Sequence, residues 1–373
     1  MTAHEISARR QDIDAKQAVI AKILSEMSCE AVILLVPAHL GWFTGGINVR
    51  GLLAEAERPG VFCNGRNRWL VCGNVDTQRL FDEELDGLGF MLKEWNWSVG
   101  RAQFLGDLLT GKKIASDRPF PGMPLIVDRL RPELRPLYPT DRNHLIEVGE
   151  IVAHALEATA RGLSRGDTEQ EIAGQLAHRT YHRGAEVHSI SVTADSRGSA
   201  FRRSGFTDTP VDRICSLQLT AVRGSLYATA SRTVCFGTPP DDFRQLFDQT
   251  CKLSAVFCSQ SLPDETISSA VETAFRLVRG TPYEHDWRLC TPGYGTGWFA
   301  SDELRRTGHD ERFVDRQPVV WQARLGSAAV VDTVLVTPTG AESVTQPYEW
   351  PFKRIVIGGH PYSIPDLLIR SDD

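Results

Sequence analysis

Hydrophobic and polar residues alternate along the first third of the chain with periods that predict both helices and strands. Residues 5–28 carry apolar side chains at helical spacing, and the apolar run at 31–36 has the length of a buried strand. Two further apolar runs flank Asn64–Asn67, a pattern typical of a hairpin. Further segments continue the alternation to about residue 135, with helices expected over 76–85 and 102–109 and a strand over 90–97. This pattern favours a small α/β domain.

The rest of the chain predicts a different arrangement. The proline-rich stretch 129–139 predicts a linker, which divides the chain into domains 1–138 and 139–373. Thr168 and Glu171 form a capping box that opens a helix. Two helices, a β-hairpin, two helices and then strands indicate an α+β domain. These elements are expected over 141–160, 168–183, 214–222, 226–236, 241–260, 266–279, 318–324 and 328–337.

Composition and charge exclude several classes of protein. The 373 residues include 41 Lys and Arg and 47 Asp and Glu, and the net charge of −6 argues against a nucleic-acid binder. No apolar run is long enough for a membrane span, and no secretory signal is visible at the N-terminus, so a cytoplasmic protein is expected. The eight cysteines form no CxxC pair and are expected to be reduced and buried.

Five short motifs follow one another in an informative order. They are Trp42–Gly46, Gly184–Glu186, Arg223–Val234, Gly293–Gly297 and Val331–Val336. Together they resemble motifs of the pita-bread superfamily, which includes creatinase, prolidase, aminopeptidase P and methionine aminopeptidase. The resemblance covers roughly residues 31–345. It implies a C-terminal pita-bread domain and a smaller creatinase-like α/β N-terminal domain.

The resemblance also implies a dinuclear metal site built from two Asp, one His and two Glu. The positions that correspond to these ligands hold other residue types, namely Gln218, Thr229, Tyr294, Gln322 and Val331. Two amides, a hydroxyl, a phenol and a valine cannot offset the charge of two divalent cations. We therefore expect no metal and no other cofactor. Arg232 and Asp332 keep the family's residue types and are expected to form a structural pair.

Creatinase, which hydrolyses a C–N bond without metal, suggests where a substrate would bind. Its catalytic His corresponds most closely to Arg203, in a loop that also contains Arg202, and a second pocket His corresponds to Ser301. These arginines could clamp an anion or belong to a solvated loop. Arg324 is a further candidate binding residue.

The polar residues at the former ligand positions are the other candidates for binding. Gln218 and Gln322 lie on predicted buried strands, so we expect their amides to bond each other, Tyr294 or a ligand. Tyr294 could be a packing aromatic or a pocket phenol that donates a hydrogen bond or a proton. Thr229 could bind substrate or be an ordinary strand residue.

Candidate catalytic residues are Tyr294, His285 and Glu303, the last two because they lie in clusters of acid and base groups around the glycine motif. The resemblance implies a homodimer in which the N-terminal domain helps to close the neighbouring pocket. Arg50 could reach that pocket or remain a surface residue.

Three hypotheses for function follow. The first is a metal-independent enzyme, a hydrolase or lyase that acts on the C–N bond of a small anionic or zwitterionic amino-acid-derived molecule, with a role in specialised metabolism. The second is a catalytically silent pseudo-peptidase that binds a small molecule or a protein partner. The third, an ordinary metal-dependent aminopeptidase, conflicts with the substituted ligand positions.

Overall fold

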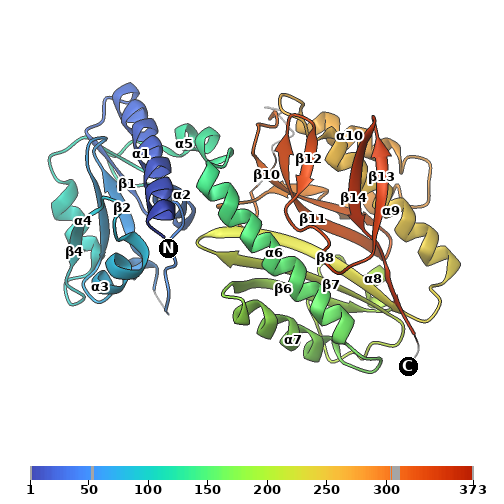
Figure 1. Cartoon of the computed structure of the whole chain (residues 1–373). Helices are drawn as coiled ribbons and strands as arrows, with labels where there is room; N and C mark the ends of the chain where they lie inside the picture. The colour runs from blue at the N-terminus through green and yellow to red at the C-terminus, as the bar shows by residue number, and fades with distance from the viewer. Residues whose placement is uncertain (1, 52–53, 303, 305–310, 372–373) are drawn as a thin grey trace. The chain divides into compact units, whose positions relative to one another are not determined.

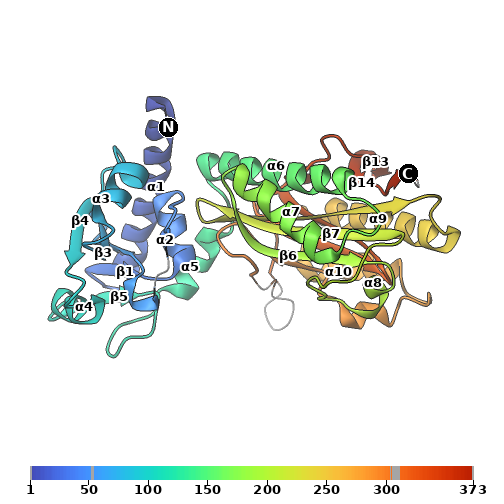
Figure 2. The same cartoon turned by 90° about the horizontal axis from the view of Figure 1, so that it is seen from below.

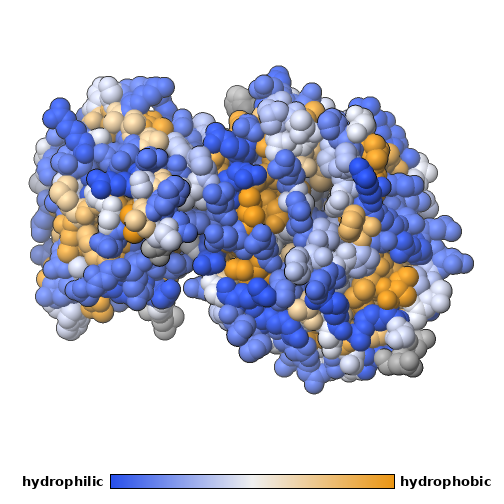
Figure 3. All heavy atoms as spheres, in the orientation of Figure 1, coloured by the Kyte–Doolittle hydropathy of each residue, from blue (hydrophilic) through white to orange (hydrophobic). Residues whose placement is uncertain are grey.

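A computed structural model describes residues 2–51, 54–302, 304 and 311–371. The chain divides into two compact units, Met1–Arg142 and Asn143–Asp373, and Figure 1 traces both from blue to red along the sequence. None of the helices in the described ranges is long and apolar enough to cross a membrane. Polar residues predominate on the face shown in Figure 3, with smaller apolar groups between them.

A mixed sheet forms the centre of the N-terminal unit. Its strands are β1 (Ala31–Leu34), β2 (Gly60–Cys63), β3 (Arg68–Gly73), β4 (Met91–Trp95) and β5 (Ile114–Ser116). The helical segments are α1 (Ala3–Glu26), α2 (Pro37–Thr44), η1 (Glu55–Glu57), α3 (Thr77–Arg79), η2 (Leu80–Leu85), α4 (Arg101–Leu109) and α5 (Val127–Leu134). The strand order is β4-β3-β2-β1-β5, with parallel pairs at its two ends and antiparallel pairs between them.

The hairpin predicted around Asn64–Asn67 is confirmed. The turn joins β2 to β3, and the Asn64 side-chain oxygen accepts hydrogen bonds from the backbone N–H groups of Arg66 and Asn67 at 3.1 and 2.8 Å. An asparagine side chain that bonds its own following backbone stabilises such turns. Local turn chemistry therefore determines this connection.

The first half of the predicted linker at 129–139 is helical. Residues up to Leu134 belong to α5, although Pro132 lies inside that helix. A proline inside a helix removes one backbone hydrogen bond and costs about 3 kcal/mol. Leu130, Leu134 and Leu137 are buried, so the packing of their side chains outweighs the effect of the proline.

The C-terminal unit is built on a larger sheet. Its strands are β6 (Glu186–Ala194), β7 (Ile214–Arg223), β8 (Leu226–Phe236), β9 (Gly293–Gly295), β10 (Pro318–Leu325), β11 (Ala328–Thr337), β12 (Gly340–Ser343), β13 (Phe352–Ile357), β14 (His360–Pro365) and β15 (Leu368–Arg370). Its helical segments are α6 (Pro139–Gly162), which begins just before the unit boundary, α7 (Glu169–His182), α8 (Arg197–Ala200), α9 (Asp241–Gln260), α10 (Ile267–Arg276) and η3 (Asp286–Leu289).

The strand order of this sheet is β6-β7-β8-β11-β10-β9, with β12 added to β11 and β15 to β8, while β13 and β14 form a separate pair. Helices α6 and α7 lie beside β6 and β7 (Figure 2), α9 packs against β10 and β11, and α10 packs against α9. The capping box predicted at Thr168 and Glu171 is present at the start of α7. The elements expected in this part of the chain all form.

The strands of this sheet have one apolar and one polar side. On β10, Trp321 is buried and stacks on Phe257 of α9 with ring centroids 4.4 Å apart, whereas Gln322 and Arg324 belong to the opposite side. Successive side chains on a strand point to opposite faces, which explains this division. A Cβ at Gly293 would lie 2.5 Å from the Trp321 ring, so glycine allows β9 to approach β10.

Candidate functional site

A cavity of about 410 Å³ lies on the polar side of the large sheet. Strands β6, β7, β8, β9, β10 and β11 each contribute to its wall, as does the segment from Gly198 to Gly205. Its volume is in the range of sites that bind small molecules. The cavity therefore collects residues that are more than 140 positions apart in the sequence.

Hydroxyl groups supply much of the polar lining. Ser204 lies 3.0 Å from the Ser191 hydroxyl and 2.7 Å from the Thr193 hydroxyl, which joins the loop to β6. Ser216, Thr220 and Ser231 lie along β7 and β8 on the same side of the sheet. A hydroxyl can donate or accept, so this wall can adapt to either kind of ligand atom.

Tyr294 lines the cavity, as expected of a pocket phenol. Its hydroxyl donates a hydrogen bond to the Thr229 hydroxyl at 3.4 Å, and Thr229 lies 2.9 Å from Thr220. Burial raises the pKa of the Tyr294 phenol above its ordinary value, so the phenol stays protonated near neutral pH. Thr229 is fully buried and does not line the cavity, but both of these neighbours do.

The two glutamine amides behave differently from one another. Gln322 donates to the Thr291 carbonyl at 3.3 Å and bonds neither Gln218 nor Tyr294, contrary to one expectation. The Gln218 amide makes no hydrogen bond to any residue that the structure describes, and it lines the cavity. Gln218 is therefore available to a ligand.

Three arginines lie along one side of the cavity. Arg202 pairs with Asp286 at 3.1 Å, and Arg324 donates to the carbonyls of Gly198, Phe201 and Arg202. Burial, with a contribution from neighbouring Arg202, lowers the pKa of Arg324. Arg203 is exposed to the cavity and has no ion pair with a described residue.

A buried carboxylate anchors the loop that carries Arg202 and Arg203. Glu169 is completely buried at the start of α7. One of its oxygens accepts from the Ala194 N–H and Arg197 Nε, and the other accepts from the N–H and hydroxyl of Thr207, each at 2.8 Å. These bonds fix both ends of the loop relative to β6.

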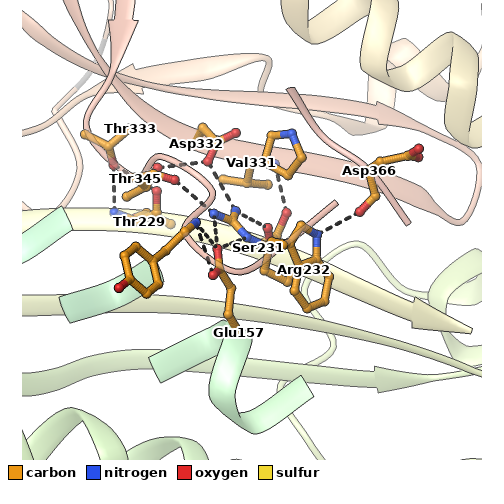
Figure 4. A network of polar contacts seen from close by, with 12 residues as sticks. Glu157, Thr229, Ser231, Arg232, Val331, Asp332, Thr333, Thr345 and Asp366 are labelled. Atoms are coloured by element: carbon orange, nitrogen blue, oxygen red, sulfur yellow. Dashed lines mark hydrogen bonds and ion pairs between the residues drawn. The ribbon is translucent and has the colours of Figure 1, made fainter. Parts of the chain in front are cut away.

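A second polar network supports the floor of the cavity (Figure 4). Arg232 lies between Glu157 and Asp332, with nitrogen–oxygen distances of 3.2 and 3.5 Å, which confirms the structural pair expected from the sequence. Burial raises the pKa of Asp332 to about 6. The Ser231 hydroxyl accepts from the Val331 N–H at 2.9 Å, so β8 and β11 are joined at the cavity itself.

The chain is similar to known proteins in both sequence and structure. No protein-family model matches the chain. Xaa-Pro dipeptidase from Pyrococcus furiosus is 22% identical over 230 residues, and that from Pyrococcus horikoshii is 19% identical over 206. The matches cover 59% and 53% of this chain but only 66% and 58% of those relatives' own length.

The structural similarity covers more of the chain than the sequence similarity does. Dipeptidase PepE from Mycobacterium ulcerans superimposes with a TM-score of 0.75 at 16% identity, covering 97% of this chain and 99% of that one. X-Pro aminopeptidase from Thermotoga maritima gives 0.73 at 16% identity, covering 96% and 99%. The chain has the pita-bread fold. This confirms the fold expected from the five motifs.

The residues present do not fit the dinuclear metal site that the resemblance implies for a pita-bread protein. Gln218, Tyr294, Gln322 and Val331 line the cavity together, and Thr229 lies directly behind it, so the five positions converge as the resemblance predicts. None of them is an anion. Among the described residues, no three His, Cys, Asp or Glu side chains are grouped so that they could hold a metal ion.

Not every candidate reaches this cavity. Arg202, Arg203, Gln218, Tyr294, Ser301, Gln322 and Arg324 line it. His285 is exposed and is not part of the lining, whereas its neighbour Asp286 pairs with Arg202. Glu303 lies outside the described residues. Arg50 belongs to the N-terminal unit, where it pairs with Glu83 at 3.3 Å.

His188 is a lining residue that the sequence reasoning missed. The pairing of β6 with β7 is interrupted by a bulge between Val187 and Ser189, and His188 occupies it. Its ring packs edge-on against Tyr227 with centroids 5.1 Å apart. Bulges often redirect a side chain beside a functional site. No local signal marked His188, because the bulge exists only once β6 pairs with β7.

Proposed function

We propose that this pita-bread protein is a peptidase-related enzyme that acts without a bound metal. Its substrate is a small anionic or zwitterionic amino-acid-derived molecule, and the bond that it breaks is a C–N bond. The observation that carries the proposal is the composition of the cavity. Gln218, Tyr294 and Gln322 occupy positions that the resemblance implies for metal ligands, and Arg203 lines the same cavity. Polar and cationic groups there favour recognition of an organic anion.

Two lining residues have suitable chemistry for such a reaction, one to transfer protons and the other to donate a hydrogen bond. In hydrolysis, water adds to the carbon atom of the C–N bond. The bond then breaks, and the departing nitrogen takes up a proton. Among the described lining residues, His188 is the one whose side-chain type accepts and donates protons most readily near neutral pH. Tyr294 keeps its proton and is suited to donate a hydrogen bond to a developing oxyanion.

The experiment measures amine release from a panel of N-acylated amino acids and dipeptides by protein treated with a chelator. We expect turnover to survive chelation. Tyr294→Phe removes the hydroxyl and should therefore lower kcat by about 100-fold. Because the variant keeps the ring, KM should change little. Tyr181→Phe removes the same hydroxyl from an exposed side chain of α7 that does not line the cavity, and it serves as the matched control. Turnover that disappears with chelation and returns with added metal would overturn the proposal.

The second candidate function is a pseudo-peptidase that binds a ligand or partner without changing it. The observation that favours it is the absence of any carboxylate among the described residues that line the cavity, because related chemistry commonly uses one as a base. In this case ligands bind but no amine is released. Tyr294→Phe should then alter affinity by at most about 1 kcal/mol.

A further inference from the structure

The charges around the cavity are unbalanced. Three guanidinium groups line it, those of Arg202, Arg203 and Arg324, and no described lining residue is an Asp or Glu. Asp286 neutralises Arg202 from outside the lining, at 3.1 Å. Arg203 and Arg324 form no direct ion pair with a described carboxylate, and Asp286, already paired with Arg202, only partly offsets the charge of Arg324.

The two unbalanced arginines are held differently. Arg324 is fixed by four backbone carbonyls, so it contributes a positive field but has few free donors. Arg203 has no such partners among the residues that the structure describes, and it is exposed to the cavity, so its guanidinium can form a bidentate bond with a carboxylate. Glu169 anchors the loop that carries Arg203, which keeps this group close to the wall of hydroxyls.

An ammonium group would find no carboxylate among the described residues that line the cavity. The available acceptors are neutral, namely hydroxyl oxygens and the Gln218 amide oxygen. Like charges in a partly buried site repel one another strongly, so the arginines disfavour a ligand with a free amine. A ligand with two anionic groups would balance the two arginines. If its nitrogen is uncharged, the ligand also needs no counter-charge from the cavity.

We propose that the pocket selects an organic dianion whose nitrogen is uncharged, as in an amide, and rejects molecules with a free ammonium group. This rests on the proposed function, which it narrows from anionic or zwitterionic molecules to N-acylated dicarboxylates and compounds of the same charge. The selection follows from Arg203 and Arg324 acting together, with the hydroxyl wall of Ser191, Thr193 and Ser204 accommodating the remaining polar atoms.

The test is calorimetric titration of the full chain with three matched probes. N-acetyl-L-glutamate carries two negative charges, N-acetyl-L-glutamine has nearly the same shape with one charge fewer, and L-glutamate has a free ammonium group. We expect N-acetylglutamate to bind at least about 10-fold more tightly than either of the others, since loss of one charge-assisted bidentate bond costs at least that factor. Its affinity should fall with added salt.

A pair of variants connects the preference to the cavity. Arg203→Gln should reduce the advantage of N-acetylglutamate over N-acetylglutamine to less than about 3-fold, because the interaction with the second carboxylate is lost. Arg276→Gln makes the same change in net charge on the exposed surface of α10 and should leave the preference intact. If both variants lose the preference for N-acetylglutamate to the same extent, then the overall charge of the protein, and not Arg203, produces it.

The outcomes separate this inference from the proposed function. Tighter binding of glutamate, equal binding of the three probes, or no binding of any probe at millimolar concentration would overturn the inference. Turnover of a zwitterionic dipeptide in the amine-release assay would then still support the proposed function. Conversely, the expected order of affinities without any turnover would support the inference and favour the pseudo-peptidase.

Discussion

Replacement of Glu169 by Gln tests whether the loop beside the cavity is held by a buried charge. The carboxylate accepts four hydrogen bonds at 2.8 Å and pairs with Arg197, whose side chain is only 20% exposed. Glutamine has nearly the same size but replaces one acceptor oxygen with an NH₂ group. Two of the four donors lose their acceptor, and Arg197 loses its counter-charge.

These contacts determine how much the free energy of unfolding should fall in the Glu169→Gln variant. One buried N–H without an acceptor costs about 1–3 kcal/mol, and breaking a buried ion pair costs about 3–5 kcal/mol, a figure that the partial exposure of Arg197 reduces. The Thr207 hydroxyl can rotate to accept from the new NH₂ and recover part of the loss. The free energy of unfolding should therefore fall by about 3 kcal/mol.

The assay is thermal unfolding followed by tryptophan fluorescence, together with calorimetric binding of N-acetylglutamate. A loss of about 3 kcal/mol in a unit of this size should lower the Tm by about 6–12 °C. Affinity should fall as well, because Arg203 lies on the loosened loop. Glu171→Gln is the matched control, since that carboxylate is exposed and glutamine can also complete a capping box. If the two variants unfold at the same temperature, the anchoring role of Glu169 is refuted.

Three further results are expected. Elemental analysis of the purified protein should find no stoichiometric transition metal, and two ions per chain would contradict the assignment of the cavity. Burial raises the pKa of Asp332 to about 6, above its unfolded value near 3.9, so the folded state binds this proton more tightly. The Asp332 contribution to the free energy of unfolding should therefore decrease as the pH rises from about 4 to 6. Asp332→Asn should flatten that dependence in pH-resolved urea unfolding, and an unchanged slope would exclude Asp332 as its source. Light scattering should show a homodimer, and a monomer at micromolar concentration would remove the support for a shared site at Arg50.

The sequence by itself determined most of the helices and strands, through local information: the spacing of apolar residues, the Asn64 turn and the capping box at Thr168. The order of its motifs indicated the fold, and the pairing of Arg232 with Asp332 was expected from that resemblance alone. The strand positions of Gln218 and Gln322 were also predictable, because strand periodicity assigns each residue to one side of a sheet.

Only the tertiary structure decided which polar groups face one another. The segment around Pro132 is helical because its leucines are buried, a fact that local propensity does not contain. His188 enters the cavity through a bulge that exists only when β6 pairs with β7, and Glu169 reaches Thr207 across 38 residues. Such contacts depend on how strands align and loops close in space. For this reason sequence reasoning chose His285 for proton transfer, while the folded chain places His188 at the cavity.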